Sequence, residues 1–187
     1  KLTVSVIDQT APSQTLGKQS LQPKGIYYTR VSGIWQTVWL EDVPERHFRM
    51  VKMKPRIAED TLRVLPTLEG EPLKAERIVV TVRDGDRVVG VADAALSVRI
   101  PDAKLWSPRS PSLYGITMEL FDGEELIDCV ESYAAMREIG TVRGPGGQIR
   151  MTLNGKVVFH YGTLDQGWWP DGLLTPPSDA AMRFDVE

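Results

Sequence analysis

The chain of 187 residues has an ordinary globular composition, with 42% hydrophobic and 25% charged residues, and is long enough for one full domain and parts of others. Its formal net charge of -3 comes from acidic and basic residues scattered along the sequence, so we expect no nucleic-acid partner. No apolar run approaches the roughly 18 residues of a membrane span, and the first twenty residues lack a signal-peptide pattern, so we expect no membrane partner.

The first part of the chain contains two strand-like segments separated by a loop. Leu2, Val4 and Val6 alternate with polar residues from the first position, which predicts a strand. Residues 9–25 are rich in Pro, Gly, Ser and Gln and predict a long loop. Residues 34–40 are dense in β-branched and aromatic side chains and predict a second strand. Because a domain rarely begins within a strand, this part indicates the end of a domain.

The middle of the chain carries strand signals at the spacing typical of a β-sandwich. Apolar residues recur with a period of two, which places one face of each strand inward. In residues 48–53 this alternation slips by one position and predicts a β-bulge. The predicted strands are residues 46–54, 61–68, 78–83, 87–91, 96–100, 113–121 and 126–139.

The composition changes after Gly140. The glycine-rich residues 144–147 indicate a flexible boundary. Asn154-Gly155, flanked by alternating apolar residues up to residue 161, predicts a hairpin with a type I′ turn. Ser178 is predicted to cap the N-terminus of a helix over the residues that follow it.

Residues capable of nucleophilic or metal chemistry are few. Cys129 is the single cysteine, which excludes an internal disulfide and a cysteine-based zinc site. We expect it to be a small core residue of a strand, with a reactive thiol as the less favoured alternative. His160 is expected to be a structural histidine within a strand and His47 a surface residue. The sequence therefore predicts no metal and no cofactor.

Three separated stretches resemble glycoside hydrolase family 2, which contains β-galactosidases, β-glucuronidases and β-mannosidases. Residues 32–41, SGIWQTVWLE, are similar to the motif that closes the family's jelly-roll sugar-binding domain. Residues 105–114, LWSPRSPSLY, are similar to a late-strand signature of its immunoglobulin-like domain. Residues 153–162, LNGKVVFHYG, are similar to the hairpin and first strand that lead into its catalytic (β/α)8 barrel.

The resemblance implies an internal fragment of a larger protein, with an all-β, immunoglobulin-like sandwich at its centre. Residues 1–42 would be the end of the jelly-roll domain, residues 43–140 the sandwich and residues 141–187 the start of the barrel domain. Two departures from the family pattern stand out. Residues 135–137 are Ala-Met-Arg where many members have Gly-Phe-Arg, and residues 163–166 replace a loop of the Asn-x-His type.

The resemblance also implies which residues act on a sugar. In the family the two catalytic glutamates come from later barrel strands, so we assign no catalytic residue and expect the fragment alone to be inactive. The loop after the first barrel strand faces the substrate. Asp165 or Gln166 would bind hydroxyl groups there, and Trp168 and Trp169 would stack on a sugar ring, with simple packing as the alternative for the aromatic pair. Asp185 and Glu187 are expected to be solvated or at an interface, with a catalytic role as the less favoured alternative.

The function implied is architectural: a spacer that holds the sugar-binding domain against the barrel and helps form the cleft. The alternative is an independent carbohydrate-binding or adhesive module, disfavoured because predicted strands between residues 46 and 100 contain Phe48 as their one aromatic residue. Trp35 and Trp39 are expected to pack in a core or against another domain. The expected partners are a carbohydrate, adjacent domains of the same chain and a second copy, because truncated edges expose apolar surface. The sequence leaves the compartment open between periplasmic or secreted and cytoplasmic.

Overall fold

The computed structural model describes residues 1–9, 17–93 and 95–187. The chain forms two compact units. The first, here named the sandwich unit, is Glu41–His160, and the second, here named the terminal unit, combines Lys1–Leu40 with Tyr161–Glu187.

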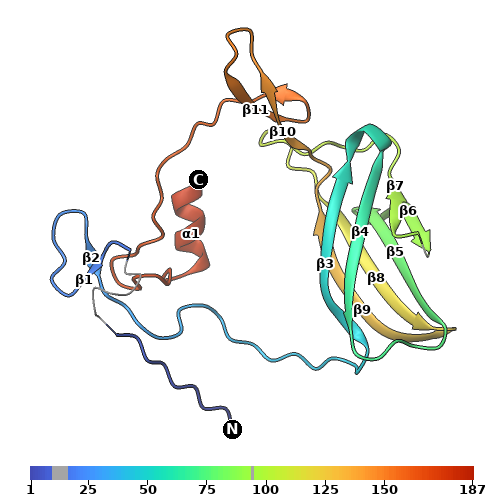
Figure 1. Ribbon diagram of the computed structural model, residues 1–187, viewed down its shortest axis with the longest axis horizontal. Helices are drawn as coiled ribbons and strands as arrows, with labels where there is room; N and C mark the ends of the chain where they lie inside the picture. The colour runs from blue at the N-terminus through green and yellow to red at the C-terminus, as the bar shows by residue number, and fades with distance from the viewer. Residues whose placement is uncertain (10–16, 94) are drawn as a thin grey trace. The chain divides into compact units, whose positions relative to one another are not determined.

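The sandwich unit contains two antiparallel sheets that face each other (Figure 1). One has the strand order β3-β4-β7 and the other the order β6-β5-β8-β9. The first sheet consists of β3 (His47–Arg56), β4 (Thr61–Glu69) and β7 (Ser97–Arg99), with the short 3-10 helix η1 (Ile57–Glu59) between β3 and β4. The second consists of β5 (Glu76–Asp84), β6 (Arg87–Asp93), β8 (Tyr114–Asp122) and β9 (Glu125–Ala134). The predicted strands of the middle region are confirmed, with bounds that shift by a few residues, except for the last one, which ends earlier than predicted.

The core lies between the two sheets and is built mainly from alternate residues of their strands, together with Ile100 and Met136 just beyond the ends of β7 and β9. The alternation predicted from the sequence is therefore what places these side chains on one face. Burying each of them contributes at most about 1.5–3 kcal/mol relative to exposure. The side chains that are 0–2% exposed are Leu62, Val64, Val80, Val82, Val98, Ile100, Ile116, Met118, Leu120 and Met136.

Polar contacts also join the two sheets. The predicted β-bulge is confirmed by a register shift between Phe48 and Met50 in the β3–β4 ladder. Beside it, the backbone N–H of Phe48 donates to Asp128 Oδ2 at 2.9 Å, which ties the edge strand β3 to the edge strand β9. This bond satisfies a backbone donor that the ladder leaves unpaired.

An ion pair closes the sandwich near the start of β3 and β5. Arg46 Nε lies 2.7 Å from Glu76 Oε2 and its Nη2 donates to Oε1 at 2.9 Å. Arg46 Nη1 also donates to the carbonyl oxygen of Gly70 at 2.7 Å. The guanidinium lowers the pKa of the Glu76 carboxyl below its ordinary value of 4.5, and the carboxylate raises the pKa of Arg46. The bidentate geometry is the strong form of such a pair.

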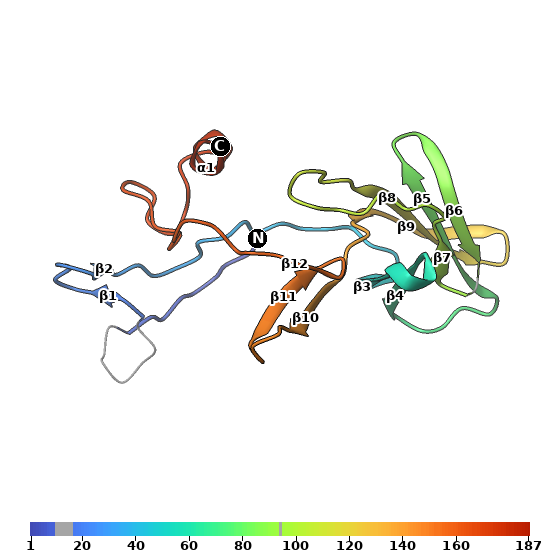
Figure 2. The same ribbon diagram turned by 90° about the horizontal axis from the view of Figure 1, so that it is seen from above.

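A small third sheet belongs to the same unit (Figure 2). It consists of β10 (Ile139–Arg143), β11 (Ile149–Leu153) and β12 (Lys156–Val157), all antiparallel. The predicted turn is confirmed, because Asn154 and Gly155 have φ values of 51° and 75° and a type I′ turn requires positive φ at both positions. The predicted strand beyond residue 157 is not formed.

Asn154 fastens this small sheet to the sandwich. Its side-chain Nδ2 donates to the carbonyl oxygen of Trp106 at 3.0 Å, and its Oδ1 accepts from the backbone N–H of Glu138 at 2.9 Å. Its own backbone N–H donates to the carbonyl oxygen of Glu138 at 2.8 Å. One turn residue therefore joins three segments that are distant in the sequence.

Several predictions for the sandwich unit are wrong. The strand predicted for residues 126–139 ends at Ala134, because the chain leaves the sheet and Met136 pairs with Leu105 instead. Cys129 lies on β9 but is exposed rather than in the core. It pairs with Glu119, whose neighbours Met118 and Leu120 point into the core, so this position faces outward. His47, expected at the surface, is half-buried, and its Nδ1 donates to the carbonyl oxygen of Pro44 at 2.9 Å.

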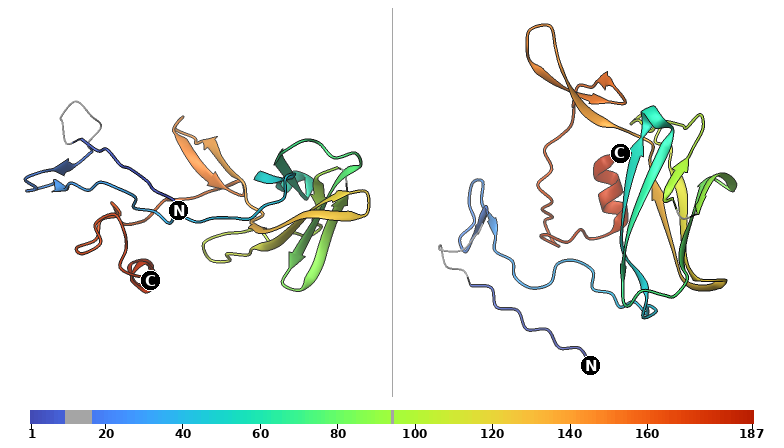
Figure 3. Two further views of the ribbon diagram at one scale, coloured as in Figure 1. Left: turned by 90° about the horizontal axis from the view of Figure 1, so that it is seen from below. Right: turned by 45° about the vertical axis from the view of Figure 1, so that its right-hand side comes forward.

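The terminal unit has little regular structure (Figure 3). Two strands of two residues each, β1 (Gln19–Ser20) and β2 (Tyr28–Thr29), pair in parallel, and the helix α1 spans Asp179–Val186. The predicted N-cap is confirmed, since Ser178 Oγ accepts from the N–H of Ala181 at 3.1 Å. No described helix is long and apolar enough to cross a membrane. Part of the predicted loop over residues 9–25 falls on residues 10–16, outside the described residues.

The strands predicted for residues 2–6 and 34–40 are wrong. These segments are exposed and irregular, because no described segment pairs with them and an unpaired strand has no ladder of hydrogen bonds. Trp35 and Trp39 are 53% and 71% exposed, so neither is a core residue of this chain. His160 is likewise exposed and outside any strand.

Candidate functional site

A hollow of about 990 Å³ in the terminal unit contains all four residues predicted to bind a sugar. Asp165 and Gln166 are exposed, whereas Trp168 and Trp169 are half-buried. Asp185 of α1, which the sequence indicated as solvated, is exposed and also lines this hollow. The helix and the loop over residues 163–169 thus contribute to one surface.

Tyr28, which lies in the N-terminal segment of the terminal unit, contacts the loop over residues 163–169. Its hydroxyl donates to Gln166 Oε1 at 2.7 Å, and its ring stacks on that of Trp168 with centroids 4.6 Å apart and planes inclined by 23°. One face of the Trp168 ring is therefore covered by Tyr28. The side-chain carbonyl of Gln166 is engaged, so its amide group is the part able to donate to a hydroxyl.

Sequence reasoning missed Tyr28. It lies 138 positions from Gln166 and outside every motif that carried the family resemblance. The available signal is weak: two adjacent tyrosines, Tyr27 and Tyr28, within a segment otherwise predicted as loop. The register of β1 and β2, which pairs Gln19 with Tyr28, supports the position of the ring.

The loop itself is shaped by short-range hydrogen bonds. Asp165 Oδ1 accepts from the N–H of Gly167 at 2.7 Å, and Gly167 has a φ of 64° that favours glycine. Further on, the N–H of Trp169 donates to the carbonyl oxygen of Leu173 at 2.8 Å, and the reverse bond measures 3.2 Å. A side chain at Gly172 would place its Cβ 1.8 Å from the carbonyl oxygen of Thr175. These features hold the two tryptophans in a defined turn.

The side chains that line this hollow are able to form hydrogen bonds with hydroxyl groups. Two carboxylates, an amide and aromatic rings can accept and donate hydrogen bonds and pack on an apolar ring face. The lining residues include Asp165 and Asp185 but no Lys, Arg or His. An anionic ligand would be repelled, whereas a neutral one would not. Among the described residues no group of three or more His, Cys, Asp or Glu side chains is placed to hold a metal ion.

Comparison with known families identifies the sandwich unit. Its two sheets with a shared core define an immunoglobulin-like β-sandwich, and residues 54–137 match the family described as Glycosyl hydrolases family 2. The matched residues run from the end of β3 to just beyond β9. This part of the chain therefore belongs to glycosyl hydrolases family 2, as its immunoglobulin-like domain region.

Individual relatives support the same assignment. A β-galactosidase from Leuconostoc mesenteroides subsp. mesenteroides is 28% identical over 144 residues, which cover 62% of this chain and 14% of the relative. The structure of β-glucuronidase from Ruminococcus gnavus in complex with D-glucuronic acid has a TM-score of 0.60 at 17% identity and covers 71% of this chain and 22% of that chain. The apo structure of that enzyme gives a TM-score of 0.54 at 18% identity, covering 64% and 20%. The likeness to the solved structures shows the fold, and this chain spans about one seventh of the β-galactosidase relative's length.

Proposed function

We propose that this chain is a non-catalytic part of a longer family 2 glycoside hydrolase, in which the sandwich unit is a spacer between a sugar-binding domain and a catalytic domain. The observation that supports it is the family match to residues 54–137, which coincides with the closed core of the two facing sheets. The relatives are several times longer than the region they share with this chain. A spacer needs a rigid core and exposed faces for its neighbours, and this unit has both.

The flanking domains are part of the same proposal. Residues 1–42 would end a jelly-roll domain, residues 43–140 would form the sandwich, and residues 141–187 would begin a (β/α)8 barrel. The sequence motifs are the support for the two flanking assignments. The small sheet β10–β12 folds with the sandwich unit in this structure. We therefore regard it as the connection between the sandwich and the barrel.

The terminal unit would supply a substrate-binding surface of the longer enzyme. The contact of Tyr28 with Gln166 and Trp168 supports this role, because it joins the proposed end of the sugar-binding domain to the proposed barrel loop. The acidic lining of the hollow favours a neutral sugar over a uronic acid at this surface.

The test uses the gene extended through the barrel. In that protein Tyr28→Phe removes one hydrogen bond to Gln166 and is expected to raise the KM for a chromogenic neutral glycoside by about 3- to 10-fold, with a smaller effect on kcat. The control is Tyr27→Phe, whose side chain is 52% exposed, and it is expected to leave KM unchanged. Equal KM values for both variants would overturn the proposed role of the terminal unit.

A further inference from the structure

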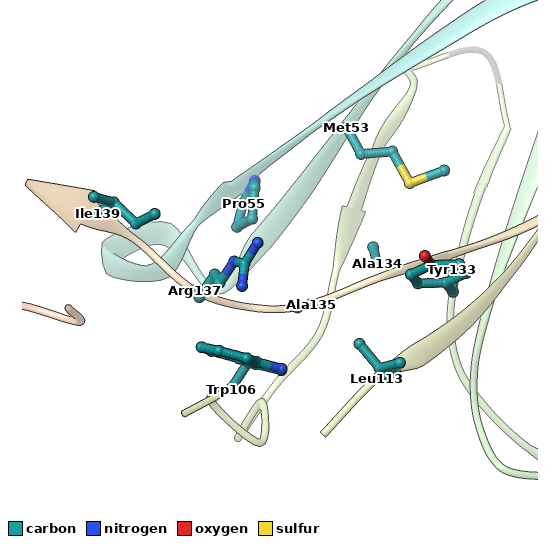
Figure 4. A pocket seen from close by; sticks show the side chains of 9 residues that line it. All are labelled: Met53, Pro55, Trp106, Leu113, Tyr133, Ala134, Ala135, Arg137 and Ile139. Atoms are coloured by element: carbon teal, nitrogen blue, oxygen red, sulfur yellow. The ribbon is translucent and has the colours of Figure 1, made fainter. Parts of the chain in front are cut away.

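The sandwich unit has a second hollow, separate from the one described above (Figure 4). Its volume is about 560 Å³, within the usual range of roughly 300–1,000 Å³ for small-molecule sites. One side of the hollow is lined by Met53 and Pro55 of β3, and another side by Trp106 and Leu113. The end of β9 and the chain that follows it contribute Tyr133 and Arg137.

Arg137 holds a positive charge at one end of this hollow. Its Cζ lies 4.5 Å from the ring centroid of Trp106. Figure 4 shows the two side chains next to each other. Among the described residues no carboxylate lies within ion-pair distance of Arg137. Arg77 provides a contrast, because its Cζ lies 4.6 Å above the ring of Phe121 but its Nη1 is 3.1 Å from Asp93 Oδ2. The N–H donors of the planar Arg137 guanidinium are therefore available for two parallel hydrogen bonds to the carboxylate of a ligand.

The backbone of Trp106, whose ring lies beneath this guanidinium, is held by two hydrogen bonds. Its backbone N–H donates to the carbonyl oxygen of Met136 at 2.9 Å, and its carbonyl oxygen accepts from Asn154 Nδ2 at 3.0 Å. Met136, next to Arg137, is 1% exposed. The loop before Trp106 is also held, since the N–H of Lys104 donates to the hydroxyl of Tyr114 at 2.7 Å. The stacked pair thus stands on a rigid base, which lowers the ordering cost of binding.

The other end of the hollow is aromatic and open. Tyr133 is 70% exposed, and its hydroxyl makes no hydrogen bond with a described residue. Ala134 and Ala135 lie between Tyr133 and Arg137 in the sequence, and their small side chains do not fill the space between the two ends of the hollow. Tyr133 and Arg137 are four positions apart, which corresponds to at most about 13 Å in a fully extended chain and is more than the width of one sugar ring. The geometry suits a ligand with a carboxylate at one end and a second ring at the other.

We propose that this hollow binds an acidic oligosaccharide, with a uronic acid carboxylate on Arg137 and a neighbouring sugar ring packed on Tyr133. The site belongs to the sandwich unit and does not depend on the proposed spacer role or on the terminal unit. Its charge is opposite to that of the terminal-unit hollow, so the two surfaces select different ligands. A sandwich domain would then hold an acidic chain as well as its neighbouring domains.

Saturation-transfer NMR on the 187-residue chain tests this proposal with three probes. Digalacturonate contains both rings and carboxylates, cellobiose only the rings and acetate only a carboxylate. We expect a saturable signal from digalacturonate, and at least about tenfold weaker binding of the other two. Equal binding of acetate would reduce the hollow to a general anion site, and no binding of digalacturonate would leave it as a packing surface; either result overturns the proposal.

Variants locate the binding. Arg137→Gln is expected to weaken digalacturonate binding at least about tenfold, and circular dichroism checks that the variant remains folded. Arg77→Gln is the matched control, because it removes an equal charge from another arginine–aromatic stack, and it should leave binding unchanged. Equal losses in both variants, or a loss in Trp168→Ala with none in Arg137→Gln, would contradict the assignment to this hollow.

Discussion

Asn154 offers a quantitative test of how the small sheet is attached to the sandwich. It is the single asparagine of the chain, and its side chain makes two hydrogen bonds, to Trp106 and Glu138. Each typically contributes about 0.5–1.5 kcal/mol. Its φ of 51° would cost an alanine about 1–2 kcal/mol more than a residue suited to this region. Asn154→Ala should therefore lower the free energy of unfolding by about 2–5 kcal/mol.

Two further variants separate these contributions. Asn154→Gly keeps the positive φ without strain but loses both hydrogen bonds, so we expect a smaller loss of about 1–3 kcal/mol. Asp102→Ala places an alanine at a φ of 53° in an exposed turn where the aspartate side chain makes no hydrogen bond with a described residue, and it measures the strain alone. Urea unfolding followed by circular dichroism provides the values. Asn154→Ala no more destabilising than Asp102→Ala would refute the role of the hydrogen bonds.

Other predictions concern the core, pH, the thiol and association. Leu62→Ala should cost about 2–5 kcal/mol in urea unfolding, whereas Leu65→Ala, on the same strand but 42% exposed, should cost much less; similar losses would contradict the core. Because the pKa of Glu76 is lowered in the folded state, its contribution to stability is present above about pH 4.5, the ordinary value, and is lost as the pH falls through the folded-state pKa. Glu76→Gln should therefore narrow the difference in Tm between pH 7 and pH 3. An unchanged difference in Tm would refute this prediction. Partial burial, together with the nearby charges of Glu119, Glu131 and Asp128, raises the pKa of the Cys129 thiol above 9.0. Iodoacetamide at pH 8 should therefore alkylate Cys129 more slowly in the folded protein than in the urea-unfolded protein. Equal alkylation rates would contradict the raised pKa. The exposed apolar segments should make the chain self-associate in sedimentation velocity as concentration rises, and a monomer at every concentration would count against this.

The sequence predicted the sandwich well because its strands are buried on one face. A period of two over Leu62 and Val64, or over Ile116 and Met118, is produced by that burial and can be read directly. The turn at Asn154-Gly155 and the helix cap at Ser178 could be predicted equally well, because both depend on neighbouring residues alone. These features need no knowledge of distant segments.

The remaining features depend on distant segments and could not be predicted in the same way. Residues 34–40 have a strong strand pattern, but a strand also requires a partner, and no described segment provides one. For Cys129 the pattern predicted the strand correctly but not which face it occupies, since this follows from the pairing with Glu119. Tyr28 reaches the candidate site through a contact across 138 positions, for which local periodicity carries no information.

Hydrolysis measurements test the central claim most directly. The 187-residue chain and the same gene extended through the barrel would be compared on chromogenic β-galactosides, β-glucuronides and β-mannosides under identical conditions. The proposed spacer role predicts turnover by the extended protein and none by the 187-residue chain. Turnover by the 187-residue chain that is lost on changing Asp165 or Asp185 to asparagine would contradict it and would place catalysis in the terminal-unit hollow.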